Sequence, residues 1–294
     1  MNVPVYVVRL MKRCNSRCEF CSSEAEMAAA RARPDVPLAD VRNDILSQPP
    51  GSIIDFFGGE PTLYPGIVEA VEFASRNGYR PTIASNGRRF AGKAFTTDMA
   101  RAGLTLVHST LLGDTAALHN ALSVGGRNSF RETVDGFKNI LARGIRLQVN
   151  IVILRENFRR LARMTSRLLD LGVRDVKFGS LLAAGNYPHL AARISETRPF
   201  LAEAVAVARA RGSRFSIEKT PICMLPEAAD HFQPENDPLA DRRSDFGSPE
   251  CSRCLVQDRC FGVDPGYAAL FGRGELKAVT DKRTARLKWP PRRP

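Results

Sequence analysis

The chain is poor in the features that mark membrane and secreted proteins. No early apolar run is long enough to span a bilayer, and residues 1–10 lack the basic start and long apolar segment of a signal peptide. Cysteine is also scarce: the seven cysteines stand in two groups, too few and too clustered for a secreted disulfide scaffold. Because reduced thiolates that hold metal suit a reducing compartment, we expect a cytoplasmic protein without a membrane partner.

The charge balance is basic, with 43 lysines and arginines against 31 acidic residues and a formal net charge of +12. Such a balance occurs in proteins that bind nucleic acid or another anionic partner. Here the arginines are scattered, and a solvated surface explains Arg/Ala-rich helices equally well. Charge alone is therefore weak evidence, and we do not expect a nucleic-acid partner.

Three cysteines near the N-terminus, Cys14, Cys18 and Cys21, have the spacing Cys-x3-Cys-x2-Cys. They follow an apolar run, Val3–Leu10, that predicts a buried strand. A cuboidal four-iron, four-sulfur cluster normally takes four thiolates, so three closely spaced ligands leave one iron open to a substrate or cofactor. Taken alone, the triplet is also compatible with a zinc site whose fourth ligand is distant.

A second motif, Gly58-Gly59-Glu60-Pro61-Thr62, comes directly after another predicted buried strand, Ile53–Phe57. Two glycines let the backbone approach a ligand closely, so that its amides and carbonyls become the recognition groups. The presence of this motif beside the cysteine triplet makes the zinc interpretation of the triplet much weaker.

Together the two motifs resemble the radical S-adenosylmethionine (SAM) superfamily, in which the cysteine loop follows the first strand and Gly-Gly-Glu-Pro follows the second. The resemblance implies that the cysteines hold a 4Fe-4S cluster whose open iron chelates SAM, and that SAM is cleaved to a 5′-deoxyadenosyl radical. It also implies that Phe20 shields the cluster. The residues that would line the methionyl amino group are Gly58, Gly59, Glu60 and Pro61.

The rest of the chain alternates between predicted strands and helices, which argues for a parallel α/β sheet. The predicted strands are Val3–Leu10, Ser52–Phe57, Arg80–Ala84, Thr105–Leu111, Arg146–Leu154 and Asp175–Ser180. The predicted helices between them are Leu38–Leu46, Ile67–Arg76, Thr97–Ala102, Phe130–Ala142 and Phe158–Leu171. An eight-unit barrel would need more chain, and the resemblance implies a partial (β/α)6 barrel with ligands at the carboxyl ends of its strands.

Polar residues at three other strand ends are candidate SAM contacts. Ser85 and Asn86 resemble the ribose-contacting position of the superfamily, although Asn86-Gly87 is also a plain turn signal. Ser109 lies where the superfamily often contacts the SAM carboxylate. Asn150 interrupts an apolar run and must find a partner if buried, so it is either a SAM contact or a satisfied core amide.

The other four cysteines lie in an irregular, proline-containing region. Cys223 comes first, and Cys251, Cys254 and Cys260 have the spacing Cys-x2-Cys-x5-Cys. The pattern resembles the SPASM/twitch extension of some radical SAM enzymes, which holds auxiliary iron-sulfur clusters. Asp264 stands where the full SPASM pattern has a further cysteine, so the resemblance implies one auxiliary 4Fe-4S cluster; a four-cysteine zinc site is the alternative.

These observations predict a barrel domain over residues 1–217, a cluster-binding extension over 218–275 and a basic, flexible tail over 276–294. The expected function is a radical SAM enzyme that oxidises or crosslinks a small-molecule or peptide natural product, with a flavodoxin- or ferredoxin-type reductant. No leader-binding domain is evident before Cys14, which favours a small molecule or a short peptide. The alternatives are an RNA-modifying radical SAM enzyme and a noncatalytic iron-sulfur protein with a binding or regulatory role.

Overall fold

A computed structural model describes residues 3–21, 34–182, 184–232 and 245–285. Its seven strands form one sheet in which the strand order follows the chain, from β1 to β7. Each strand pair with a defined register, from β1–β2 to β4–β5 and β6–β7, is parallel. The strands are β1 (Val5–Met11), β2 (Ile53–Gly58), β3 (Arg80–Ala84), β4 (Leu106–Thr110), β5 (Arg146–Ile153), β6 (Asp175–Ser180) and β7 (Arg214–Glu218).

Helices connect successive strands, and further short helices follow β7. The α-helices are α2 (Leu38–Leu46), α3 (Ile67–Arg76), α4 (Lys93–Arg101), α5 (Ala116–Ser123), α6 (Ser129–Ala142), α7 (Leu161–Asp170), α8 (Ile194–Ala210), α9 (Pro249–Ser252), α10 (Pro265–Phe271) and α11 (Lys282–Ala285). The 3₁₀ helices are η1 (Pro61–Leu63), η2 (Arg88–Ala91), η3 (Phe158–Arg160), η4 (Ala184–Asn186), η5 (Ile222–Met224), η6 (Pro226–His231) and η7 (Gln257–Arg259).

The predicted α/β fold is confirmed. All six predicted strands form, and the open sheet is consistent with a partial barrel. A seventh strand, β7, follows them in the described chain. Helix α5 was not predicted. Its N-cap is Thr115, whose hydroxyl accepts a hydrogen bond from the amide of Leu118. A single capping residue before so short a helix is a weak signal in the sequence.

The described chain divides into two compact units. The first lies within residues 1–150 and 170–174, and the second within residues 151–169 and 175–293. The predicted domain boundary at residue 217 stays a prediction, as does the flexible tail, whose residues 286–294 lie outside the described part of the chain. Among the described helices, none combines the length and apolar character that a bilayer crossing requires.

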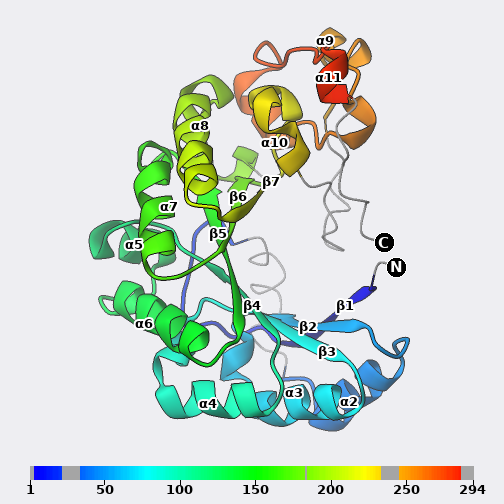
Figure 1. Ribbon diagram of the computed structural model, residues 1–294, viewed down its shortest axis with the longest axis vertical. Helices are drawn as coiled ribbons and strands as arrows, with labels where there is room; N and C mark the ends of the chain where they lie inside the picture. The colour runs from blue at the N-terminus through cyan, green and yellow to red at the C-terminus, as the bar shows by residue number, and fades with distance from the viewer. Residues whose placement is uncertain (1–2, 22–33, 183, 233–244, 286–294) are drawn as a thin grey trace. The chain divides into compact units, whose positions relative to one another are not determined.

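In the first unit, side chains alternate between the two faces of the sheet. Ile54, Phe56, Ile83, Val107 and Val149 are all fully buried, and α2, α3 and α4 lie on one side of strands β1 to β3 (Figure 1). The residues that alternate with them form the other face; Asp55, His108 and Gln148 there are half-buried, and Thr82 is buried. This second face is called the open face below, because α2, α3 and α4 lie on the opposite side of the sheet (Figure 1).

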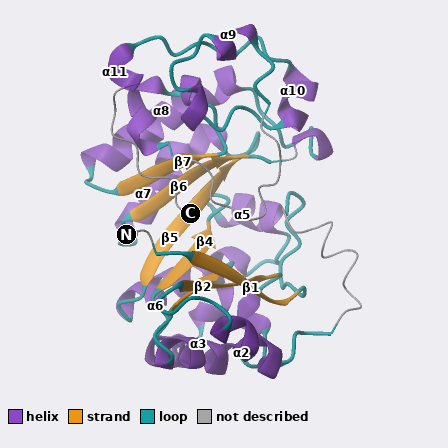
Figure 2. Ribbon diagram, turned by 90° about the vertical axis from the view of Figure 1, so that its right-hand side faces the viewer, coloured by secondary structure: helices purple, strands orange, loops and turns teal. Residues whose placement is uncertain are grey.

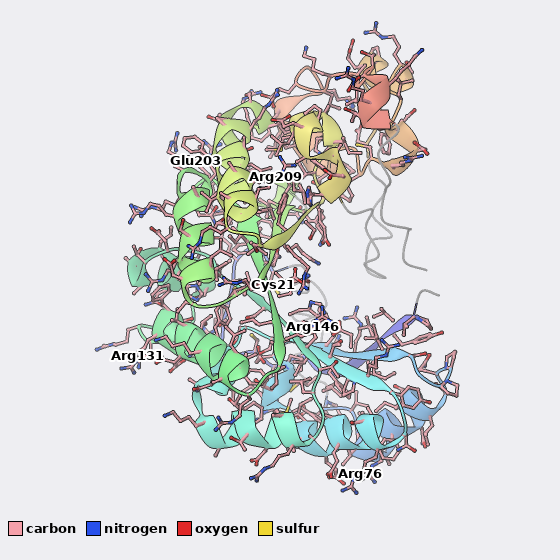
Figure 3. All side chains as sticks on the ribbon, in the orientation of Figure 1. Cys21, Arg76, Arg131, Arg146, Glu203 and Arg209 are labelled. Carbon is pink, nitrogen blue, oxygen red and sulfur yellow. The ribbon has the colours of Figure 1, made fainter. Side chains whose placement is uncertain are left out.

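Two basic residues on helices of the first unit follow the expectation of a solvated surface. Arg76 on α3 and Arg131 on α6 are exposed and point away from the sheet (Figure 3). Arg76 also forms an ion pair with Glu72 one turn earlier, at 2.7 Å. Such exposed pairs contribute little to stability, so these charges mainly keep the helix surface hydrated.

In the second unit, the segment after β7 consists of short helices joined by long loops (Figure 2). Its small apolar core contains Val263, Ala268 and Leu276. Cys223, Cys251 and Tyr267 pack against that core. With so little apolar surface to bury, this segment resembles the small domains that a metal centre commonly helps to hold together.

Candidate active site

The N-terminal cysteines lie in a loop that begins where β1 ends. The amide of Ser16 donates to the sulfur of Cys14 at 3.3 Å, and the amide of Cys21 donates to the carbonyl of Cys18 at 3.1 Å. The Cys18 thiol itself donates to the carbonyl of Ser123, at the end of α5, at 3.6 Å. The loop is therefore folded back on itself and tied to a neighbouring helix.

Burial keeps the thiols of Cys14 and Cys18 protonated in the free protein. It raises the pKa of Cys14 to about 11 and that of Cys18 to about 12. The charge of Cys21 adds to the rise at both positions, so the three sulfurs are near enough to interact. Iron binding would have to displace each proton, which makes metal uptake pH-dependent.

The two glycines at the end of β2, Gly58 and Gly59, leave room for the start of the cysteine loop. A Cβ atom on Gly58 would lie 2.3 Å from the carbonyl oxygen of Met11, and one on Gly59 would lie 2.2 Å from that of Arg13. Because no side chain intervenes, the two segments hydrogen-bond directly. The amide of Gly59 donates to Met11 O at 3.0 Å, and the amide of Glu60 donates to Arg13 O at 2.8 Å. The sequence predicted a ligand beside these glycines, and that role stays a prediction. Their contact with the cysteine loop was missed because it depends on the pairing of β1 with β2.

Glu60 joins the ends of β2 and β3. Its carboxylate is only 1% exposed and accepts hydrogen bonds from Thr62 Oγ1 at 2.6 Å, Ser85 Oγ at 2.7 Å and the Asn86 amide at 2.7 Å. Burial raises the pKa of Glu60, and these hydrogen bonds oppose that rise. Pro61 then begins η1, which Glu60 caps.

The Ser85-Asn86-Gly87 turn reaches the cysteine loop. The side-chain amide of Asn86 donates to Asn15 Oδ1 at 2.7 Å and lies 3.9 Å from the sulfur of Cys14. Gly87 has a φ of 82°, so the plain Asn-Gly turn expected as an alternative is present. The predicted ribose contact of Ser85 and Asn86 stays a prediction, but the structure places Asn86 beside Cys14, and Ser85 contacts Glu60 instead.

Ser109 and Asn150 lie on opposite faces of the sheet. Ser109 pairs with Val149, whereas Thr110 pairs with Asn150, and residues paired in this way point to the same face. Ser109 thus faces the helices, and Asn150 lies on the open face. Both Ser109 Oγ and Asn150 Oδ1 are buried without a hydrogen-bond partner among the described residues. An unsatisfied acceptor is costly, so the satisfied-amide alternative does not hold for Asn150 Oδ1 within this part of the chain.

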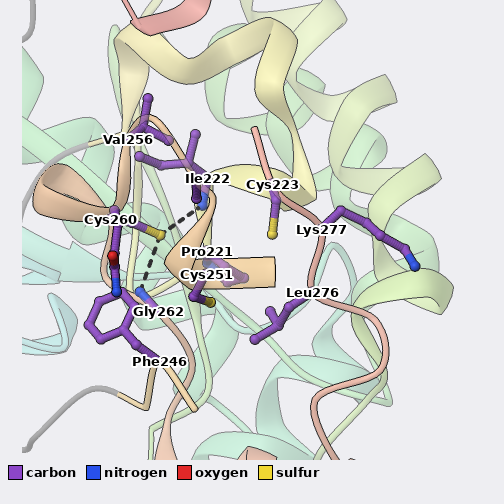
Figure 4. Close-up of a pocket in the computed structure, with 12 residues that line it drawn as sticks. Pro221, Ile222, Cys223, Phe246, Cys251, Val256, Cys260, Gly262, Leu276 and Lys277 are labelled. Atoms are coloured by element: carbon purple, nitrogen blue, oxygen red, sulfur yellow. Dashed lines mark hydrogen bonds between the residues drawn. The ribbon is translucent and has the colours of Figure 1, made fainter. Parts of the chain in front are cut away.

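The four C-terminal cysteines line one pocket of about 320 Å³ in the second unit (Figure 4). The sulfur of Cys260 accepts from the amides of Ile222 at 3.4 Å and Gly262 at 3.3 Å, and that of Cys254 accepts from Val279 at 3.4 Å. The structure therefore brings together Cys223, Cys251, Cys254 and Cys260, although Cys223 is far from the others in sequence.

The environment of these sulfurs combines burial with mutual repulsion. Burial raises the pKa of Cys260 to about 11 and also raises those of Cys223 and Cys251. Neighbouring cysteine charges raise all three further. No three His, Cys, Asp or Glu side chains within the described ranges converge closely enough to hold a single metal ion. That finding does not test a cubane cluster, whose thiolates bind different irons.

A second pocket, of about 470 Å³, lies in the same unit at the carboxyl ends of three strands. Ile153 from β5, Ser180 from β6 and Lys219, directly after β7, line it, together with Asp264 and Tyr267 beside and within α10. This is called the strand-end pocket below. Pro221 lines both pockets, so the strand-end pocket adjoins the four-cysteine pocket.

Lys219 was not singled out from the sequence. The sequence signal that could have indicated Lys219 is its position directly after a strand, because ligands bind at the carboxyl ends of strands in such folds. Lys219 also has a φ of 56°, a left-handed conformation that is uncommon outside glycine and often marks a functional site.

Comparison with known proteins identifies the family. The sequence profile of the Radical SAM superfamily matches residues 8–168, more than half of the chain. PqqA peptide cyclase of Streptomyces rochei is 26% identical over 238 residues, which cover 80% of this chain and 63% of that protein. AdoMet-dependent heme synthase of Oleidesulfovibrio alaskensis is 24% identical over 146 residues, 50% of this chain and 37% of that protein. The chain thus spans less than two thirds of the length of either relative.

Solved structures share the fold. Streptococcus suis SuiB bound to S-adenosylmethionine superposes with a TM-score of 0.60 at 15% identity, covering 78% of this chain and 51% of SuiB. The enzyme anSMEcpe with bound AdoMet gives a TM-score of 0.58 at 16% identity, covering 72% of this chain and 64% of that chain. The profile match and the fold agree with both N-terminal motifs. The chain belongs to the radical SAM superfamily, whose members use a 4Fe-4S cluster and SAM.

Proposed function

We propose that this enzyme cleaves SAM reductively and uses the resulting radical to oxidise or crosslink a peptide or small-molecule natural product. When bound, a cluster on Cys14, Cys18 and Cys21 would supply the electron for that cleavage. The remaining steps depend on how the chain holds the loop, the cofactor and the substrate.

The observation that carries the proposal is the junction of three strand ends around the cysteines. Gly59 and Glu60 hydrogen-bond the beginning of the cysteine loop, and Asn86 reaches Cys14 and Asn15. Glu60 fixes Asn86 in turn through its carboxylate. A loop held at three strand ends presents its thiols where ligands of such barrels bind.

The residues present also fit SAM. Asn150 Oδ1 is a buried acceptor that lacks a partner among the described residues, and it lies on the open face of the sheet near the carboxyl end of β5. A ligand amine or hydroxyl would satisfy it. We infer that Asn150 contacts SAM, whereas Ser109 on the opposite face would reach it only indirectly. Phe20, half-buried between two cysteines, would limit solvent access to the cluster.

We further propose that Cys223, Cys251, Cys254 and Cys260 hold an auxiliary 4Fe-4S cluster within a SPASM/twitch-like extension over residues 218–275. Their convergence on one pocket supports this, as do the amides that donate to the sulfurs of Cys254 and Cys260. Such N–H donors stabilise ligating thiolates and tune cluster potential. With four thiolates and no open position, the cluster would relay electrons rather than bind substrate.

The strand-end pocket is the proposed substrate site. Its walls are mainly apolar, with Ser180, Lys219 and Asp264 as polar groups that would orient a ligand. It adjoins the four-cysteine pocket through Pro221, so an electron from a substrate radical would travel only a short way. One relative is a PqqA peptide cyclase, and the structurally similar SuiB binds the precursor peptide SuiA, which favours a peptide substrate here. A flavodoxin- or ferredoxin-type reductant and a cytoplasmic location complete the proposal.

Iron analysis tests the two-cluster assignment. After anaerobic reconstitution, we expect about eight irons per chain. The variant with Cys14, Cys18 and Cys21 changed to alanine should keep about four, as should the variant with Cys251, Cys254 and Cys260 changed. Full iron content in the first variant would refute the N-terminal site. Zinc in place of iron after anaerobic isolation of the first variant would refute the auxiliary cluster.

A further inference from the structure

Arg88 connects the cysteine loop to helix α6. Its side chain is only 12% exposed, and its Nε donates to Glu132 Oε2 at 2.7 Å. At the other end of the guanidinium, Nη1 donates to the carbonyl of Asn15 and lies 3.4 Å from Ser16 Oγ. One charged group thus bridges a rigid helix and the segment between Cys14 and Cys18.

The position of Arg88 is itself tightly defined. Its amide donates to Asn86 Oδ1 at 3.1 Å, directly after the left-handed Gly87. Helix α6 packs on this turn so closely that a Cβ atom on Gly136 would lie 2.1 Å from Gly87 O. Glu132 lies one helical turn before Gly136, so it shares the face that meets the turn. The anchor for Arg88 is therefore built into the helix contact.

The other end of the same loop segment has a separate anchor. The carbonyl of Ser123, at the end of α5, accepts from the Arg17 amide at 3.0 Å and from the Cys18 thiol at 3.6 Å. The next residue, Val124, has a φ of 43°, a strained conformation for a β-branched residue. The segment between Cys14 and Cys18 is thus held at its start by Arg88 and at its end by α5.

We propose that Arg88 is a positioning residue that orders the loop between Cys14 and Cys18 before any metal binds. It acts through the Asn15 carbonyl and the Ser16 hydroxyl. Ordering an irregular loop costs conformational entropy, and charge-assisted hydrogen bonds from a buried guanidinium offset that cost in advance. Pre-ordered ligands bind metal faster and more tightly than ligands that must first be ordered.

Arginine suits this role better than lysine. The planar guanidinium donates from two ends at once, whereas a lysine ammonium is a compact charge on a flexible stem. Arg88→Lys should therefore keep the charge near Glu132 but lose one of the two connections. The proposal predicts an intermediate effect for lysine and a full effect for glutamine.

Hydrogen exchange in the metal-free protein tests this directly. In Arg88→Gln, exchange of the Arg17 amide and its neighbours in residues 12–21 should accelerate about tenfold to a hundredfold, the factor expected from loss of a charge-assisted hydrogen bond. Arg88→Lys and Glu132→Gln should give smaller increases. Arg155→Gln is the matched control, because its Nε also donates to a backbone carbonyl, that of Ala191 at 3.0 Å, but in the second unit.

Iron uptake at limiting iron is the second measurement. Uptake should be slowest in Arg88→Gln and partly restored in Arg88→Lys, with no change in Arg155→Gln. Unchanged exchange in residues 12–21 of a folded Arg88→Gln would overturn the proposal and leave Arg88 as a structural link to α6. If that variant does not fold, Arg88→Lys and Glu132→Gln decide the question in the same way. The hydrogen-exchange measurement uses metal-free protein, so its outcome does not depend on the proposed function, which is tested by iron binding of the wild-type protein.

Discussion

Replacing Gly59 by alanine should disrupt the cysteine loop itself. The new Cβ atom would lie 2.2 Å from Arg13 O and 2.5 Å from Lys12 O, and both are backbone atoms that no side-chain rotation can move away. Relief requires β1 and β2 to separate at their ends, which lengthens the hydrogen bonds from Gly59 to Met11 and from Glu60 to Arg13. Overpacking costs about 1–3 kcal/mol, and two weakened hydrogen bonds add about 1 kcal/mol each.

We therefore expect Gly59→Ala to destabilise the metal-free protein by about 3–5 kcal/mol and to lower its melting temperature by roughly 6–15 °C. Iron content after reconstitution should fall toward that of the triple cysteine variant. Gly274→Ala is the matched control, because nothing lies within 4 Å of a Cβ atom built there. Thermal melting and iron analysis check the prediction. A variant with wild-type melting temperature and full iron, but weak SAM binding, would show that Gly59 only makes room for SAM.

Three further changes test other parts of the site. Burial lowers the pKa of His119 to about 4, with a smaller contribution from the charge of Arg88. Below about pH 6.5 the unfolded chain therefore binds a proton at His119 that the folded protein does not, and the free energy of unfolding decreases as the pH falls. Between pH 7 and pH 5 this should cost about 2 kcal/mol in denaturant titrations, and His119→Asn should remove that slope; an unchanged slope would contradict the assignment. Asn150→Leu removes an unsatisfied acceptor, so thermal melting of the metal-free protein should show a free energy of unfolding about 1 kcal/mol higher. Equilibrium binding should show weaker SAM affinity, and an unaltered affinity would exclude a SAM contact. Changing Cys254 and Cys260 to alanine should preserve 5′-deoxyadenosine formation but stop product formation, as followed by mass spectrometry, whereas turnover at the wild-type rate would leave the extension a structural role only.

The strands and the two N-terminal motifs could be predicted because their signals are local. An apolar run followed by cysteines or glycines marks a strand end without knowledge of its neighbours. Helix α5 was not predicted because its start depends on the single cap Thr115, which is a much weaker signal. Residues within one turn or strand determine such features.

Roles that depend on pairing between strands could not be predicted. Gly58 and Gly59 face the end of β1 because β1 is the neighbour of β2, and only the register shows this. Likewise, Ser109 and Asn150 both stand near strand ends, but the β4–β5 register separates them onto opposite faces. Arg88 looked like one more scattered arginine, since Glu132 and Asn15 lie far from it in sequence.

The central claim is that Cys14, Cys18 and Cys21 support reductive cleavage of SAM. The most direct measurement is the 5′-deoxyadenosine formed by anaerobically reconstituted, chemically reduced protein supplied with SAM. We expect it to form with the wild-type protein and with the Cys254/Cys260 double variant, and to be absent from the Cys14/Cys18/Cys21 triple variant. Wild-type protein that holds its full iron but forms no 5′-deoxyadenosine, or a triple variant that still forms it, would contradict the account.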